Sequence, residues 1–170
     1  MIRNILLFSL LLSLSGCWPS SLSLVDSGSM PPEWKTFSIK TLENNAPNTP
    51  LSFSATLSEK LKDGVQNNTR LLLNSEVGKG EVSIEGIISN YSITPIALQE
   101  GDNSAKNRLT VSVQFIIFVS APKEDKMTVT STRFVDYDSN SDLATQETAL
   151  LEDISVQIVQ DVINKLLSNW

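Results

Sequence analysis

The amino-acid sequence predicts an α+β fold: a two-layer sandwich, with a mostly antiparallel sheet of four to five strands and two helices packed on one face. Two observations lead to this fold class. Apolar and polar residues alternate along several successive stretches, which is typical of strands with one buried face. Two other stretches repeat apolar residues every three or four positions, which is typical of amphipathic helices. The order is β-α-β-β-β-β-α, and such grouping favours helices on one side of an antiparallel sheet.

The first strand and the first helix are predicted in the N-terminal part of the domain. The stretch EWKTFSIKTL, residues 33–42, alternates weakly and predicts a strand, which NNAPNTP then ends. A helix is predicted from Ser52 to about Asn68, because its apolar residues recur every four positions. This stripe consists of Phe53, Leu57, Leu61 and Val65. Ser52 is a favoured N-cap, and an Asn in the left-handed conformation is expected at the other end.

Two further strands are predicted after this helix. RLLLN, residues 70–74, predicts a short buried strand. EVSIEGIISNYSITPI, residues 81–96, has alternating apolar residues at Val82, Ile84 and Ile88. Gly86 within it is a place for a bulge or for the close approach of a neighbouring segment.

The strongest strand signal is RLTVSVQFIIFV, residues 108–119. Its odd-numbered residues are all apolar, whereas the even-numbered residues up to Gln114 are polar, so one face belongs to the core. Ile116 and Phe118 then interrupt the polar face, and we take this apolar patch as the candidate contact for a partner protein. APKED predicts a hairpin turn into another strand, KMTVTSTRFV, residues 126–135.

A long C-terminal helix is predicted from about Leu143 to Leu167. Its apolar residues form one broad stripe, as expected for a helix that packs on a sheet. The stripe consists of Leu150, Leu151, Ile154, Ile158, Val159, Val162, Ile163 and Leu166.

The stretch DYDSNSDLATQE, residues 136–147, allows two interpretations. Its oxygen-bearing side chains have the spacing of calcium ligands in a known loop type. These residues are Asp136, Asp138, Asn140, Asp142 and Glu147. However, Ser141 stands where that loop needs Gly, and a Thr-rich strand precedes it where a helix is expected. The alternative, which we favour, is a strand-to-helix connection in which Asp and Ser act as N-caps, and we assign no metal site.

The composition excludes most enzyme classes. The chain of 170 residues contains no His and one Cys, which removes the commonest general base, the Ser-His and Cys-His pairs and most zinc sites. It also lacks the phosphate-binding loop, the nucleophile elbow and the dinucleotide-binding glycine motif. A formal net charge of −6 disfavours nucleic acid as a partner. We therefore expect no catalytic residues, no cofactor and no nucleic-acid partner.

The N-terminus has the features of a lipoprotein signal. Arg3 precedes an apolar run of residues 5–14, which is too short for a spanning helix of roughly 20 apolar residues. Small residues stand directly before Cys17, the single cysteine of the chain, and resemble the bacterial lipobox. We therefore expect residues 1–16 to be removed as a signal peptide and Cys17 to carry a lipid anchor.

The region after Cys17 predicts a tether followed by one domain. Residues 17–32 are rich in Pro and Ser, so they are assigned to the lipidated N-terminus and a flexible tether. Residues 33–170 then form a single α+β domain. Trp18 stands where an inner-membrane retention signal has Asp, so by resemblance to lipoprotein sorting rules we expect a periplasm-facing outer-membrane location.

Lys106 and Arg108 are candidates for a ligand site. They are two residues apart at the start of the central strand, so their side chains project from the same side. In this position they either hold a phosphate group or keep a solvated strand end soluble. The sequence favours the solvated strand end, because surface cations are common and a pair of like charges carries little specificity.

Several sequence blocks together resemble the LptE family, the lipopolysaccharide-assembly lipoproteins of Gram-negative outer membranes. The blocks are the lipobox, NNAPNTPLSFSATLSEKLKDGV, GIISNYSITPIAL, AKNRLTVSVQFIIFV, RFVDYDS and the closing VINKLLSNW. They cover essentially the whole chain after the signal peptide. The resemblance implies a lipid-anchored α+β domain that acts as a plug inside a large outer-membrane β-barrel. The pair receives lipopolysaccharide from a periplasmic bridge and delivers it to the outer leaflet.

The resemblance also implies partners and binding residues. The partners would be the large β-barrel of the lipopolysaccharide translocon, lipopolysaccharide itself, and the membrane through the lipid anchor. Family members bind lipopolysaccharide through basic residues, and Lys106, Arg108 and Arg133 are the nearest candidates. Arg133 shares its strand parity with Met127 and Val129, so it faces outward only if a bulge intervenes. The alternative is a free-standing periplasmic ligand-binding or envelope-scaffold lipoprotein with the same fold.

Overall fold

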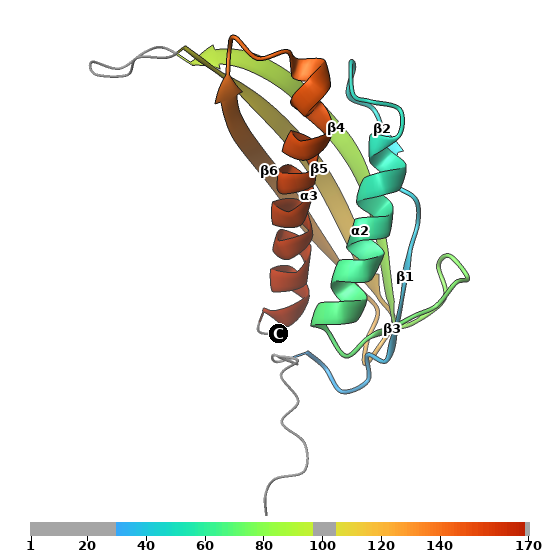
Figure 1. Ribbon diagram of the computed structural model, residues 1–170. Helices are drawn as coiled ribbons and strands as arrows, with labels where there is room; N and C mark the ends of the chain where they lie inside the picture. The colour runs from blue at the N-terminus through green and yellow to red at the C-terminus, as the bar shows by residue number, and fades with distance from the viewer. Residues whose placement is uncertain (1–29, 97–104, 169–170) are drawn as a thin grey trace, which may run out of the picture.

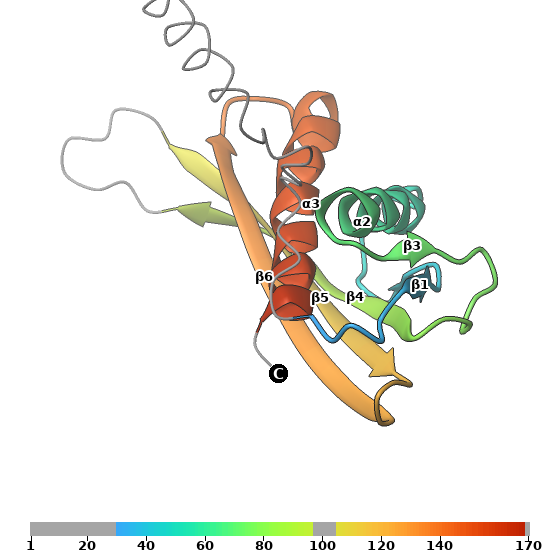
Figure 2. The same ribbon diagram turned by 90° about the horizontal axis from the view of Figure 1, so that it is seen from below.

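The computed structural model describes residues 30–96 and 105–168. The predicted signal peptide, Cys17, Trp18 and most of the predicted tether therefore lie outside the described residues. The elements are β1 (Thr36–Ile39), β2 (Glu43–Asn44), α2 (Phe53–Asn68), β3 (Leu72–Leu73), β4 (Val82–Ile96), β5 (Lys106–Val119), β6 (Asp125–Asp138) and α3 (Leu143–Leu167). Figures 1 and 2 show the two helices side by side on one face of a strongly curved sheet. The predicted fold class is confirmed.

The sheet is mixed, with two kinds of pairing. Its strand order is β3-β1-β4-β5-β6, and β2 also pairs with β4, so it has six strands. The long strands β4, β5 and β6 are antiparallel, as predicted. β1 and β2 pair with β4 in parallel, and β3 pairs with β1 in parallel, which the sequence did not predict. The parallel β1–β3 pair is possible because α2 provides the long crossover that parallel neighbours require.

The core lies between the sheet and the helices. On β5 the alternate residues from Leu109 to Ile117 have no exposed surface, so the predicted buried face is confirmed. The predicted stripes of α2 and α3 are also buried. A fully buried aliphatic or aromatic side chain contributes about 1.5–3 kcal/mol relative to an exposed one, so this layer is the main source of stability.

The two helices run parallel and lie very close together at Gly64. A Cβ atom added at Gly64 would overlap Val159 on α3, so glycine is what allows this separation. One turn earlier, Lys60 of α2 forms an ion pair with Glu152 of α3. Because lower-numbered residues of α2 meet lower-numbered residues of α3, both helices begin at the same end of the molecule, as Figure 1 shows.

Two local predictions around α2 and β3 were wrong. α2 ends at Thr69, which is extended, and the Thr69 hydroxyl and amide both donate to the carbonyl of Val65, so no Asn in the left-handed conformation ends the helix. The predicted strand after it is not buried, since Leu72 is 67% and Leu73 39% exposed. The reason is its position, because a two-residue strand at the edge of the sheet has no layer over its side chains.

The irregularity of β4 lies at Ser89, between Ile88 and Asn90. This extra residue reverses the alternation, so that Ile88 and Tyr91 both face the helices. Gly86 instead marks a close approach, because a Cβ there would meet the side chains of Leu42 and Phe115. The sequence therefore predicted the close approach correctly, whereas the bulge has no residue signal of its own.

Candidate functional site

The candidate site is the face of the sheet that the helices leave uncovered, called here the open face. It is formed by Ser83, Glu85 and Ile87 of β4, the even-numbered residues 106–118 of β5 and the even-numbered residues 126–138 of β6. No described element lies over it, and Figure 2 shows both helices on the opposite side. The predicted basic pair and the predicted apolar patch both lie on this face.

The middle of the open face is polar but uncharged. The hydroxyls of Ser112 and Thr132 are hydrogen bonded at 2.9 Å. Next to them Gln114 lies opposite Thr130. A surface of short hydroxyl and amide side chains is suited to contact with water or with another polar surface.

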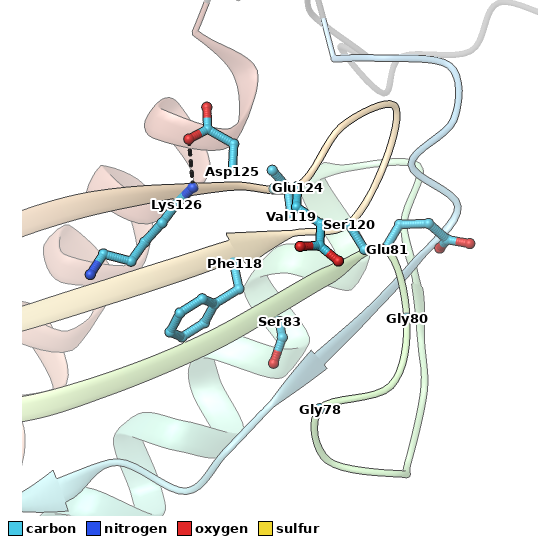
Figure 3. A pocket seen from close by; sticks show the side chains of 10 residues that line it. All are labelled: Gly78, Gly80, Glu81, Ser83, Phe118, Val119, Ser120, Glu124, Asp125 and Lys126. Atoms are coloured by element: carbon cyan, nitrogen blue, oxygen red, sulfur yellow. Dashed lines mark hydrogen bonds between the residues drawn. The ribbon is translucent and has the colours of Figure 1, made fainter.

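One end of the open face carries the predicted apolar patch. Phe118 is 40% exposed and Ile116 is half-buried, and both point away from the helices. Figure 3 shows Phe118 beside Ser83, its partner in the register of β4 and β5. Phe118 lines a hollow of about 510 Å³ between the glycine turn before β4 and the β5–β6 turn. Phe118 of the apolar patch thus forms part of the wall of a wide surface depression.

Glu81 at this hollow has a structural partner. Its carboxylate accepts hydrogen bonds from the Thr36 hydroxyl and the Thr36 amide, both at 2.8 Å. These bonds lower the pKa of Glu81 below its ordinary value. Glu81 therefore ties the start of β1 to the start of β4.

A second, smaller cavity lies where β1 and β2 approach the open face, and we call it the Glu85 cavity. Its volume is about 150 Å³. It is lined by Lys40, Thr41, Glu43, Glu85, Gly86, Ile87, Gln114, Ile116 and Thr128. Lys40 forms an ion pair with Glu43 at 3.1 Å, and its hydrogen bond to Glu43, together with the charges of Glu43 and Glu85, raises the pKa of Lys40. The Glu85 carboxylate has no hydrogen-bond or ion-pair partner among the described residues.

The other end of the open face carries the basic pair. Arg108 donates to both carboxylate oxygens of Asp136, at 2.7 and 2.9 Å, and its guanidinium lies 3.7 Å above the centre of the Phe134 ring. The hydrogen bond raises the pKa of Arg108 and lowers that of Asp136. Lys106 is exposed beside them, opposite Asp138 in the register, and its charge also lowers the pKa of Asp136.

Arg133 lies on the opposite face from this pair. No bulge interrupts the β5–β6 pairing, so Arg133 faces the helix layer, as its parity predicts. It forms an ion pair with Asp161 of α3, and Ser131 also donates to Asp161, at 2.5 Å. Burial alone would raise the pKa of Asp161, but the bonds from Arg133 and Ser131 hold it below its ordinary value. The structure therefore brings Lys106 and Arg108 together and places Arg133 elsewhere.

The former calcium candidate is a strand-to-helix connection. β6 ends at Asp138 and α3 begins at Leu143, with Asp142 as N-cap accepting a hydrogen bond from the Ala144 amide at 3.2 Å. Two of the candidate ligands are used elsewhere, since Asp136 binds Arg108 and Glu147 accepts a hydrogen bond from Tyr91. Within residues 30–96 and 105–168, no group of three or more Asp, Glu, His or Cys side chains could hold a metal ion.

Sequence reasoning missed two features of the site and one contact on the helix side of the sheet. Phe134 was not singled out, although its parity with Thr128, Thr130 and Thr132 would have placed it on the open face. Glu85 was also overlooked, and its signal was a charged residue within an alternating strand. The bond between Tyr91 and Glu147 had no signal, because it joins segments 56 residues apart. In the part of the chain that the structure describes, no helix has the length and hydropathy needed to cross a bilayer.

A twisted sheet with parallel helices on one face, and a polar open face carrying an apolar patch and a basic pair, defines a two-layer α+β domain. The family model of lipopolysaccharide-assembly proteins, LptE, matches residues 34–166, nearly all of the described domain. The chain belongs to the LptE family. The predicted resemblance is thereby confirmed.

Solved structures share this fold at low sequence identity. Uncharacterized lipoprotein B from Nitrosomonas europaea is 18% identical, with a TM-score of 0.51 over 88% of this chain and 90% of that chain. A neuraminyllactose-binding hemagglutinin homolog from Helicobacter pylori is 9% identical, with a TM-score of 0.54 over 90% and 93%. A hypothetical protein from Chlamydia trachomatis is 12% identical, with a TM-score of 0.53 over 80% and 99%. These likenesses show the fold alone. No curated protein matches the sequence.

Proposed function

We propose that the protein is a non-enzymatic outer-membrane lipoprotein that plugs, and helps to assemble, the β-barrel translocon delivering lipopolysaccharide to the outer leaflet. The observation that carries this proposal is the LptE match from residue 34 to residue 166, because it spans nearly all of the two-layer domain and not a single motif. The lipid anchor on Cys17 and the outer-membrane location are parts of the same proposal.

The open face supports the plug role. A plug inside a barrel meets a polar, water-filled lumen, so it needs a surface that is hydrophilic without large blocks of one charge. The hydroxyl and amide side chains in the middle of the open face meet this requirement. Ile116 and Phe118 add an apolar area at one end, where a tighter contact with the barrel wall would gain from the burial of apolar surface.

The position at which the chain enters the domain is also compatible with a lipid anchor. Met30 is buried, and Arg70 donates to the carbonyl of Met30 at 2.8 Å. Next along the chain, the Trp34 indole donates to the carbonyl of Ala121 at 2.6 Å. The described chain therefore starts beside the β5–β6 turn, at the end of the open face that carries Phe118. In our proposal, this is the end of the domain nearest to the membrane anchor.

The basic pair is the proposed site for a lipid A phosphate. Lys106 is exposed and has no ion-pair partner among the described residues, so it is the more available charge. Arg108 is already held by both oxygens of Asp136, and a phosphate would have to replace that carboxylate. Arg133 is neutralised by Asp161 on the other face, so as a third candidate it would act separately.

Affinity isolation of the full lipidated chain tests the proposal. The chain would be tagged at its C-terminus through a flexible linker and extracted in mild detergent, and co-purifying proteins would be identified and quantified by mass spectrometry. We expect one large outer-membrane β-barrel protein at one copy per tagged chain. If the tagged chain is folded and membrane-bound and no barrel is recovered, the plug role is wrong. The free-standing ligand-binding or scaffold lipoprotein would then be the working function.

A further inference from the structure

The Glu85 cavity has a size that suits a single amino-acid side chain. Pockets for drug-sized ligands usually have volumes of about 300–1,000 Å³. The Glu85 cavity has about 150 Å³, so it is too small for such a ligand or for the bulk of a glycolipid. It lies beside the apolar patch, because Ile116 belongs to both. A protein surface that covers the patch would therefore also cover this cavity.

The cavity combines an apolar part with a net negative charge. Ile87 and Ile116 are half-buried and supply the apolar part, whereas Glu85 lies opposite Ile116 in the register of β4 and β5. Lys40 is bound to Glu43 at 3.1 Å, so that pair is close to neutral. The carboxylate of Glu85 has no hydrogen-bond or ion-pair partner among the described residues. The three charged side chains that line the cavity, Lys40, Glu43 and Glu85, therefore sum to one negative charge.

We propose that the Glu85 cavity receives an arginine side chain of a protein partner, with its methylene groups on Ile87 and Ile116 and its guanidinium on Glu85. Charge complementarity selects this occupant, because an uncharged side chain would cover the carboxylate without pairing it, and burial of an unpaired charge is costly. An acidic side chain would be repelled. The proposal that the partner is the translocon barrel rests on the function proposed above.

Arginine fits better than lysine for two physical reasons. Its guanidinium is planar and less strongly hydrated than an ammonium group, so it can form two parallel hydrogen bonds with a carboxylate at a protein interface. Its stem packs along apolar side chains while the charged end stays at a polar group. Arginine is also among the residues that most often dominate interface energies when they fill a pocket.

Photocrosslinking identifies the occupant. A photoreactive amino acid would replace Thr128, an exposed residue at the cavity rim, in the full lipidated chain. After irradiation in cells, crosslinked peptides would be produced with a protease that does not cut at basic residues. We expect the crosslinked peptide to belong to a protein and to contain an arginine. A crosslink to lipid alone, or to a peptide without arginine, would overturn the proposal.

A charge-swap experiment then tests the pair itself. Glu85→Gln in the tagged full chain should increase the dissociation rate of the partner at least about tenfold, since loss of one member of a desolvated charge pair acts mainly on dissociation. Glu85→Arg should weaken the complex further, and changing the crosslinked arginine to Glu should restore binding to Glu85→Arg. Asp153→Asn, an exposed carboxylate change on the helix layer, is the matched control and should leave the rate unchanged.

The outcomes separate this inference from the proposed function. If the unaltered chain recovers the barrel and Glu85→Gln dissociates at the unaltered rate, the arginine inference is wrong and the plug role is unaffected. If the chain recovers a different protein whose arginine reaches Glu85, the plug role is wrong and the inference is supported. If the charge swap fails to restore binding although both variants are folded, the pairing is wrong.

Discussion

Arg133 on β6 and Asp161 on α3 form an ion pair that joins the edge strand of the sheet to the C-terminal half of the longest described helix. Ser131, two residues earlier on the same face, donates a hydrogen bond to the same carboxylate at 2.5 Å. The side chain of Asp161 is 19% exposed and that of Arg133 is 41% exposed, so the pair is only partly screened by solvent. The ion pair therefore adds a polar contact to the apolar packing between β6 and α3.

This pair predicts a specific dependence of stability on pH. The pKa of Asp161 is lowered in the folded state, so the unfolded chain binds more protons at this group as the medium becomes acidic. The stabilisation is therefore complete above the ordinary aspartate pKa of about 3.9 and is lost as the pH falls towards the folded-state pKa. Urea unfolding of the unaltered chain and of Asp161→Asn, between about pH 6 and pH 3, should give curves that converge at low pH. A constant difference would contradict the assignment.

Loss of the Tyr91 hydroxyl should destabilise the domain. Tyr91 is buried and its hydroxyl donates a hydrogen bond to Glu147. Burial is the larger cause, and this hydrogen bond the second cause, of the raised pKa of Tyr91. Tyr91→Phe leaves the carboxylate without its donor, so we expect a loss of about 1–2 kcal/mol in the free energy of unfolding. Tyr137→Phe is the matched control, since Tyr137 is equally buried on the same side of the sheet and its hydroxyl forms no such bond. Equal losses in both variants would refute a role for the hydrogen bond.

The contact of Gly64 with Val159 predicts a non-additive pair of mutations. Gly64→Ala gains about 1 kcal/mol in helix propensity but loses about 1–3 kcal/mol by overpacking against α3. We expect net destabilisation of about 1 kcal/mol in the unaltered chain. In a Val159→Ala background the overlap is removed, and Gly64→Ala should then be neutral or stabilising, as chemical denaturation would measure. Additive effects would mean that the helices can separate freely.

The apolar patch should matter for assembly more than for folding. Replacing both Ile116 and Phe118 with Ser should reduce recovery of the barrel partner, because it removes apolar surface that the complex would bury. The isolated chain should keep its circular dichroism spectrum and most of its stability, since both residues lie on the uncovered face. Val156→Ser is the control, because Val156 is 58% exposed on the helix layer. Unchanged recovery of the barrel would exclude this patch as a contact.

Lipopolysaccharide binding should respond differently to each basic residue. Lys106→Ala should weaken binding more than Arg108→Ala, because Arg108 is held by Asp136. Asp136→Asn should strengthen binding by releasing Arg108 and removing a negative charge. Titration of the detergent-solubilised chain with purified lipopolysaccharide at two salt concentrations measures these changes. Weaker binding by Asp136→Asn would contradict this model, and loss of binding in Arg133→Gln would move the site to the other face.

Patterns within single elements were predicted well from the sequence. The bounds of α3 and the buried face of β5 follow from periodicity alone, because one side of each element contacts a single layer. The side-by-side placement of Lys106 and Arg108 follows from the same rule. The sequence also led to the LptE family through a set of short blocks.

Features that depend on pairing between elements were not predicted. The Arg108–Asp136 bond requires the β5–β6 register, which is set by the turn between the strands. The Glu85 cavity requires β1 and β2 to pair with β4 in parallel, more than 40 positions apart in the sequence. The short strand β3 was misread because an apolar run at a sheet edge resembles a buried strand until its neighbours are known.

The parallel arrangement of α2 and α3 makes the domain electrically polar along its length. Each helix carries roughly half a positive charge at its N-terminus and half a negative charge at its C-terminus, and two helices in the same direction add these contributions. Neither first turn contains an acidic residue, although Asp142 at the N-cap of α3 offsets part of one. Figure 1 shows that both helices begin at the end of the domain where β5 begins, so the positive pole lies at this end. Lys106 and Arg108 stand at the start of β5. The negative pole lies where the described chain starts, so the helix dipoles favour an anion at the end that carries the basic pair.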